Sequence, residues 1–188
     1  KKINSYRGLV NYTIDSINII SAELNARGID RISEYPEVEK IYLDEYLFLC
    51  GMSVTTANKV HFSEKFKLNG SGIGIGLVDS GVFPHQDLIS PSNKIELFVD
   101  LVNNLKYPYD DNGHGTSIAG ILCSSGISSN NMYTGICSKS KLFCYKAFDR
   151  LGKGFASNIF YAIDCLINMS QEHNIKLLRI PYWEYRDN

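Results

Sequence analysis

From residue 72 onward, apolar residues follow two kinds of spacing along the chain. Short, nearly unbroken apolar runs of the length of a buried strand occur at residues 73–78, 94–99, 141–148 and 175–180. Between them, apolar residues at helical spacing predict helices at 115–124 and 156–171. Continuous apolar strands that alternate with helices are typical of a parallel sheet covered on both faces. This part of the chain is therefore predicted to have an α/β fold with a mostly parallel, doubly wound sheet.

The first 51 residues have a different pattern, which predicts a small α+β module. Two loosely alternating stretches favour strands, and a stretch between them has apolar residues at helical spacing. The predicted strands are 14–20 and 38–43, and the predicted helix is 22–33. A further helix is predicted at 57–66, in the segment that leads to the larger unit. The division predicted from these patterns is a module at 1–51 and a main domain at 52–188.

Charge and hydropathy exclude several classes of partner. The 188 residues include 19 basic and 20 acidic ones, which gives a net charge of −1. A balance so close to neutral favours neither a nucleic-acid nor a membrane-surface partner. No apolar run approaches the length that crosses a bilayer.

The cysteines point to a reducing compartment. They are odd in number, scattered, and never in Cys-x-x-Cys spacing, which argues against a disulfide framework and against a zinc site. A cytoplasmic location is therefore predicted. The five residues are Cys50, Cys123, Cys137, Cys144 and Cys165.

Two residues have the placement that acid–base chemistry requires. Asp79 ends the apolar run 73–78, and His114 begins the small-residue helix 115–124. A buried carboxylate that accepts one imidazole N–H fixes the histidine tautomer and leaves the other nitrogen free to take a proton. At a helix start, the helix dipole also opposes premature protonation of the imidazole. Asp79 and His114 are therefore predicted to be catalytic.

The segments around these two residues resemble the subtilisin-like serine peptidases. Their aspartate motif is matched by Val78-Asp79-Ser80-Gly81-Val82, and their histidine motif by Asn112-Gly113-His114-Gly115-Thr116. The order Asp, then His, then Ser is that of the family. The resemblance implies a subtilisin-like sheet and peptide-bond hydrolysis, with Asp79 orienting His114 as general base.

The nucleophile that the resemblance implies is not found before Asn188. The family's Gly-Thr-Ser-x-Ala motif has only a near match, Gly115-Thr116-Ser117-Ile118-Ala119. Ser117 lies three residues after His114 on the same predicted helix, whereas a triad needs side chains that converge from different elements. Ser117 is therefore not predicted to be the nucleophile. The 188-residue chain alone is expected to carry the Asp and the His but to be inactive.

Other stretches extend the resemblance over most of the chain. Gly152, Lys153 and Gly154 look like the family's edge segment, which implies that they pair with an extended protein or peptide substrate. Residues 1–51 are similar to the family's propeptide, which implies an intramolecular partner that blocks the cleft until it is processed near 50–56. The lead-in at 107–111 is closest to intracellular members. At 181–183 the sequence Pro-Tyr-Trp departs from the Ser-x-Gly of the family's cleft.

Alternatives from other classes remain open. One is a non-catalytic subtilase-like protein that acts as a regulator or binding partner, and another is a small-molecule-binding doubly wound domain. A dinucleotide loop is rejected because the glycines of 70–76 precede the strand instead of following it. His85 with Asp87 lacks a third metal ligand nearby, so no metal or cofactor is predicted, although the family includes calcium-binding members. Asp110 and Asp111 are interpreted as a solvated loop.

Overall fold

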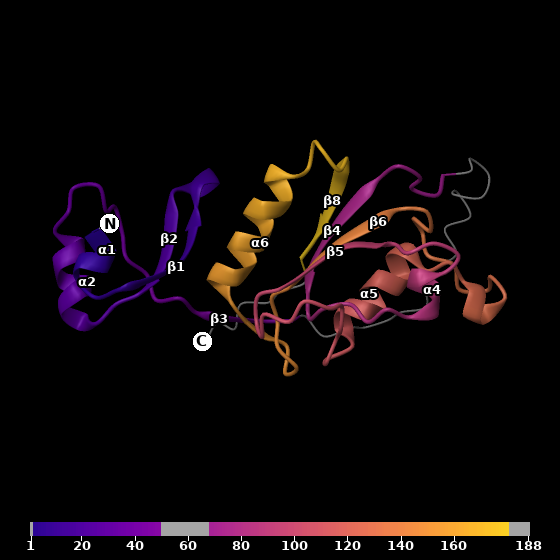
Figure 1. Cartoon of the computed structure of the whole chain (residues 1–188), viewed down its shortest axis with the longest axis horizontal. Helices are drawn as coiled ribbons and strands as arrows, with labels where there is room; N and C mark the ends of the chain where they lie inside the picture. The colour runs from indigo at the N-terminus through magenta and orange to yellow at the C-terminus, as the bar shows by residue number, and fades with distance from the viewer. Residues whose placement is uncertain (1, 50–67, 181–188) are drawn as a thin grey trace, which may run out of the picture.

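A four-stranded parallel sheet forms the centre of the C-terminal part of the chain (Figure 1). The structure is a computed structural model that describes residues 2–49 and 68–180. The spatial order of the strands is β5-β6-β4-β8, and every neighbouring pair is parallel. The strands are β4 (Gly74–Asp79), β5 (Ile95–Asp100), β6 (Lys141–Lys146) and β8 (Ile175–Arg179). The carboxyl ends of these strands therefore share one edge of the sheet.

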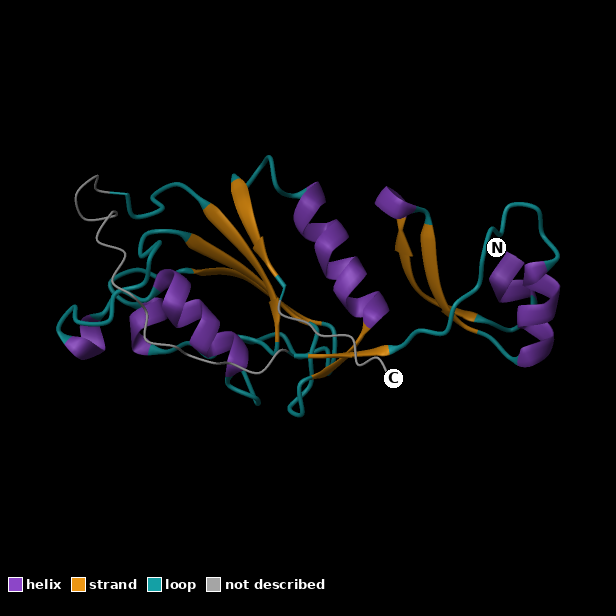
Figure 2. Ribbon diagram, turned by 180° about the vertical axis from the view of Figure 1, so that it is seen from behind, coloured by secondary structure: helices purple, strands orange, loops and turns teal. Residues whose placement is uncertain are grey.

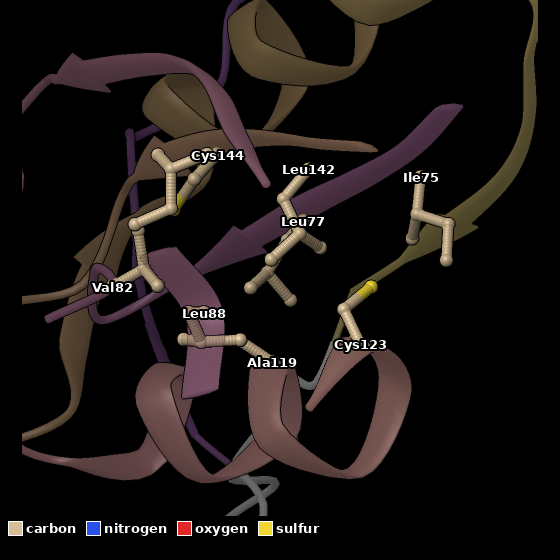
Figure 3. Close-up of a cluster of buried hydrophobic side chains, with 9 residues drawn as sticks. Ile75, Leu77, Val82, Leu88, Ala119, Cys123, Leu142 and Cys144 are labelled. Atoms are coloured by element: carbon tan, nitrogen blue, oxygen red, sulfur yellow. The ribbon is translucent and has the colours of Figure 1, made fainter. Parts of the chain in front are cut away.

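Helices cover both faces of this sheet (Figure 2). On one face, side chains of β4 and β6 pack against α4 (Gln86–Ile89) and α5 (His114–Cys123), and Figure 3 shows this cluster. On the other face, alternate residues of the same strands pack against α6 (Ala156–Asn168). Successive side chains of a strand point to opposite faces, so strands that are apolar throughout supply both layers. The predicted α/β class with a doubly wound parallel sheet is confirmed.

The N-terminal module begins with α1 (Lys2–Ser5) and a β-hairpin. The hairpin consists of β1 (Leu9–Ile14) and β2 (Ile19–Glu23), joined by the 3-10 turn η1 (Asp15–Ile17). The single strand predicted at 14–20 is therefore wrong, because that stretch spans the turn. Asn18 has the left-handed conformation (φ 54°) that lets the chain reverse there.

The helix of the module, α2 (Ala26–Ser33), begins later than its pattern predicts. The side chain of Asn25 accepts a hydrogen bond from the backbone N–H of Gly28 at 2.8 Å and caps the helix. Of the four predicted helix residues that precede α2, residues 22 and 23 belong instead to β2. The prediction of a helix is confirmed, and its first boundary is wrong.

The second predicted strand of the module, at 38–43, is also wrong. These residues pair with no strand of the described ranges 2–49 and 68–180. The chain forms a strand only slightly later, at β3 (Tyr46–Phe48), which pairs antiparallel with β7 (Lys153–Phe155). The helix predicted at 57–66, the domain boundary at 51/52 and the processing region 50–56 lie outside the described residues, as does the Pro-Tyr-Trp segment at 181–183.

The module packs against α6, beside which the hairpin lies in Figures 1 and 2. The rings of Tyr12 and Tyr161 stack with their centroids 4.4 Å apart. The Asp44 carboxylate accepts hydrogen bonds from the backbone N–H (3.0 Å) and the hydroxyl (2.5 Å) of Ser157, in the first turn of α6. Phe155, the residue that precedes α6, makes no side-chain capping bond. Asp44 therefore caps this helix from a distant part of the chain.

Replacing Asp44 with alanine should lower the free energy of unfolding by about 1 kcal/mol, the usual cost of losing an N-terminal cap. The substitution also removes a negative charge from the positive end of the helix dipole. Urea unfolding followed by circular dichroism measures the change. Asp30→Ala, at an exposed position of α2, is the control. An equal loss in both variants would contradict the capping role.

Candidate active site

The end of β4 and the start of α5 bring the two predicted catalytic residues together. The Nδ1 atom of His114 lies 2.7 Å from Oδ1 of Asp79. The Asp79 side chain is fully buried, and that of His114 is 9% exposed. This contact orients the imidazole so that Nδ1–H donates to the carboxylate and Nε2 is left as a proton acceptor. The catalytic role of both residues remains a prediction.

The Asp79 carboxylate is held by hydrogen bonds to one of its two oxygens. Its Oδ1 atom also accepts a hydrogen bond from the Ser80 backbone N–H at 2.7 Å, whereas Oδ2 has no partner among the described residues. Burial raises the pKa of Asp79 above its ordinary value, although hydrogen bonds from His114 and Ser80 act in the opposite direction. A desolvated carboxylate of this kind is stabilised most strongly when a positive charge forms on the neighbouring imidazole.

Glycines allow α5 to approach β4 closely enough for this contact. A side chain at Gly115 would collide with the carbonyl oxygen of Gly81 and would lie 3.1 Å from Cβ of Asp79. Gly113, which precedes α5, has a φ of 93°, a conformation that L side chains rarely adopt. The glycines on either side of His114 are therefore required by the turn and by the close packing.

Asp110 connects the two predicted catalytic positions, and its interpretation as part of a solvated loop is wrong. Its carboxylate accepts hydrogen bonds from the Ser80 hydroxyl at 2.8 Å and from the backbone N–H groups of Gly113 (2.9 Å) and Thr116 (2.8 Å). The Thr116 hydroxyl donates to it as well, at 2.6 Å. Burial alone would raise the pKa of Asp110, but these bonds together lower it. Asp110 thus supplies the cap that Gly113 cannot give to α5.

Lys146, at the end of β6, is a buried cation beside the same loop. Its side chain is fully buried, and Nζ donates to the carbonyl oxygens of Ser80 (2.6 Å) and Phe148 (2.9 Å) and to Oδ1 of Asp111 (2.6 Å). Asp111 therefore forms an ion pair and is not simply solvated. Sequence reasoning missed Lys146, although a charged residue inside the apolar run 141–148 was a signal that a buried partner exists.

The predicted substrate-binding residues lie on the stretch that follows β6. Lys153 and Gly154 belong to β7, and the backbone N–H of Leu49 donates to the carbonyl oxygen of Gly152 at 2.9 Å. The Asn112 side chain donates to the carbonyl oxygen of Arg150 at 3.1 Å, so the loop before His114 touches the turn before β7. Gly152, Lys153 and Gly154 are therefore at the same edge of the sheet as Asp79. Their substrate-binding role stays a prediction, and one edge of β7 is paired with β3.

Ser117 does not face His114 from another element. It is an exposed residue of α5, and its hydroxyl donates to the carbonyl oxygen of Gly113 at 2.9 Å. Within residues 2–49 and 68–180, no group of three or more His, Cys, Asp or Glu side chains is placed to hold a metal ion. Over the same ranges, no helix is long and apolar enough to cross a membrane.

Comparisons with known proteins agree with this geometry. The model of the subtilase family matches residues 70–176, which include β4, α5 and β6. Serine protease AprX of Bacillus subtilis is 32% identical over 164 residues, which are 85% of this chain and 36% of that protein. A thermostable alkaline protease of Halalkalibacterium halodurans is 24% identical over 87% of this chain and 44% of its own length.

A solved structure shows the same fold. The CspB protease of Clostridium perfringens matches with a TM-score of 0.54 and 23% identity, over 64% of this chain and 31% of that chain. The chain spans less than half of the length of each of these relatives. The resemblance predicted from the two motifs is confirmed: the chain belongs to the subtilase family.

Proposed function

We propose that this chain is the part of a subtilisin-like serine endopeptidase that holds and orients the general base. The observation that carries the proposal is the 2.7 Å contact between His114 and the buried Asp79, inside the region that matches the subtilase family. A carboxylate that fixes Nδ1–H prepares Nε2 to accept the proton of a nucleophile. The proposed nucleophile is a serine encoded beyond Asn188.

The proposed chemistry divides between this chain and the serine. Nε2 of His114 accepts the hydroxyl proton as the serine oxygen attacks the peptide carbonyl, and it then donates that proton to the leaving amine. Asp79 stabilises the imidazolium between these two steps. General-base geometry alone, without the nucleophile and an oxyanion hole, leaves little to accelerate acyl transfer. The 188-residue chain by itself is therefore expected to show no turnover.

We also propose that the N-terminal module is an intramolecular inhibitor. It is attached by the stacked Tyr12 and Tyr161 and by Asp44 at the start of α6, and its strand β3 fills the edge of β7. An extended peptide substrate would add to this same edge by strand pairing. A tethered strand competes effectively because its local concentration is high.

Labelling with a fluorophosphonate probe tests the peptidase proposal. The protein expressed from its complete coding sequence should be labelled once the N-terminal module has been removed, and His114→Ala should abolish labelling because the serine is no longer deprotonated. Ser117→Ala is the matched control, since it lies one turn further along the same helix, and it should be labelled as fast as the wild type. Labelling that persists in His114→Ala would contradict the proposal. A correctly folded wild type that stays unlabelled after removal of the N-terminal module would favour the non-catalytic binding protein.

We also propose that the protein is located in a reducing compartment, the cytoplasm. The described cysteines, Cys123, Cys137, Cys144 and Cys165, are free thiols. Burial raises the pKa of Cys123 to about 12 and that of Cys144 well above its ordinary value. Thiols in this state are poor nucleophiles, so they act as small apolar side chains.

A further inference from the structure

The two-stranded ribbon of β3 and β7 has two chemically different faces. Tyr46 lies opposite Phe155, Leu47 opposite Gly154, and Phe48 opposite Lys153. Because side chains alternate along a strand, one face carries the residues at both ends of this register and the other carries the middle pair. The outer face consists of Tyr46, Phe48, Lys153 and Phe155, and the inner face consists of Leu47, Leu49, Gly152 and Gly154.

The inner face of the ribbon makes apolar packing contacts with the core. Leu47 and Leu49 are partly buried and pack against the core layer of α6. A side chain at Gly154 would collide with the carbonyl oxygen of Ala147 and would lie 3.0 Å from the Phe148 ring, so β7 itself has no side chain on this face. On the inner face, all the apolar side chains therefore come from the strand that pairs with β7, which is β3 in this structure.

The outer face has side chains from both strands. The rings of Tyr46 and Phe155 stack with centroids 4.3 Å apart and an interplanar angle of 27°. Nζ of Lys153 lies 5.8 Å from the centroid of the Phe48 ring. Aromatic pairs and cations over aromatic rings both attract beyond the area that they bury. On β7 these two contacts depend only on Phe155 and Lys153.

We propose that Phe155 and Lys153 make this edge selective for extended peptides with aromatic side chains at both outer positions, alternating with apolar inner ones. The proposal rests on the proposed function in one respect, namely that a substrate replaces β3 in the same register. The segment Tyr46-Leu47-Phe48-Leu49 has this preferred pattern, so the chain carries its own copy of the preferred peptide. A serine at an outer position loses the ring contact, and a lysine opposite Lys153 adds like-charge repulsion.

The first test needs no catalysis, because it measures how often β3 leaves β7 in the 188-residue chain. Hydrogen exchange of the Leu49 backbone N–H, which donates to Gly152, reports that opening. Tyr46→Ser and Phe155→Ser should each speed the exchange about three- to tenfold, a range that follows from the strength of aromatic pairs. The double variant should exchange little faster than either single one, since both remove the same contact.

The control for this measurement is Tyr42→Ser, which removes an aromatic ring that is 77% exposed and belongs to no strand pair. It should leave the exchange at Leu49 unchanged. An unchanged rate in Tyr46→Ser and Phe155→Ser, or effects that multiply fully in the double variant, would overturn the proposal whatever the catalytic activity.

The second test compares peptides on the protein expressed from its complete coding sequence. The kcat/KM for a peptide containing Tyr-Leu-Phe-Leu should exceed that for Ser-Leu-Ser-Leu by about tenfold or more, if two ring contacts of this strength are lost. In the Lys153→Ser, Phe155→Ser double variant the ratio should fall close to one, because the aromatic peptide loses both ring contacts. Phe160→Ser, an exposed ring of α6, should keep the wild-type ratio.

The outcomes separate the two proposals. Labelling by the fluorophosphonate with equal rates for both peptides would overturn the selectivity and leave the peptidase proposal intact. A second outcome is that the fluorophosphonate does not label the protein, while β3 opens more slowly when the rings of Tyr46 and Phe155 are both present. This outcome would overturn the peptidase proposal, and the aromatic selectivity would remain as a property of a binding edge.

Discussion

Replacing Asp79 with asparagine should lower the kcat of the protein expressed from its complete coding sequence by about 10⁴-fold. In the proposed mechanism, the 2.7 Å contact between Oδ1 and Nδ1 of His114 holds the imidazole in one tautomer, and the charge of the carboxylate stabilises the imidazolium. An amide has neither the charge nor a preference for that tautomer. KM should change little, because the lost interaction develops only as the proton moves.

The matched control is Asp164→Asn, which also changes a buried carboxylate, on α6 and outside the site. Its kcat should stay within about twofold of the wild type, because such a distant group does not touch the reacting atoms. Steady-state hydrolysis of a peptide substrate measures both variants. A loss of similar size in both would mean that removing any buried carboxylate impairs folding, and the specific role of Asp79 would be contradicted.

Asp110→Ala should lower the free energy of unfolding by about 3 kcal/mol, the second large effect expected of a single substitution. Five donors lose their acceptor, namely the Ser80 hydroxyl, the backbone N–H groups of Asn112 and Gly113, and both donors of Thr116. Hydrogen bonds to a charged group contribute about 1.5–3 kcal/mol each, although neighbouring ones do not add fully. Denaturant unfolding of the 188-residue chain measures the loss.

The control is Ser117→Ala, at the residue next to Thr116 in α5. It removes a single hydrogen bond from an exposed hydroxyl. It should change the free energy of unfolding by less than about 0.5 kcal/mol, as is usual for surface positions. A loss of similar size in Asp110→Ala and Ser117→Ala would contradict the role of Asp110 as the acceptor that joins β4 to α5.

The same carboxylate predicts the direction of one acid dependence. Burial raises and hydrogen bonds lower the pKa of Asp110, and the net pKa is below the ordinary value. A carboxyl with a depressed pKa in the folded state stabilises that state at neutral pH, and this contribution is lost as the pH falls through the folded pKa. The stabilities of the wild type and of Asp110→Asn should therefore differ at pH 7 and converge below about pH 4. A constant difference across this range would contradict the assignment.

The sequence predicts best the elements that are buried on both sides. Strands β4 and β6 appear as apolar runs because helices cover both of their faces. In the hairpin the same reasoning fails, since Ile17, Ile19 and Ile20 are between 41% and 55% exposed, and their apolar character does not mark a buried strand. At 38–43 alternation is present, but no strand among the described residues pairs with this stretch, and Leu43 is 84% exposed.

The candidate site divides in the same way. Asp79 and His114 are found from the sequence because each lies in a local motif next to a predicted element. Asp110 and Lys146 are not, because their partners lie far away in sequence: Ser80 is 30 residues before Asp110 and 66 residues before Lys146. Neither a polar loop nor a lysine in an apolar run reveals such a partner until the strand order is known.

The alignment of strand ends has a consequence for how the sheet assembles. Asp79, Lys146 and Asp100 end three adjacent strands in matched positions. A slip of β6 by one residue would turn Phe143 and Tyr145 toward the layer of α5 and drive the ammonium group of Lys146 away from the oxygens that surround it. The ionisable residues at these strand ends therefore favour the native register of β6 over a shifted one. The proposed active site thus also helps to align the sheet that carries it.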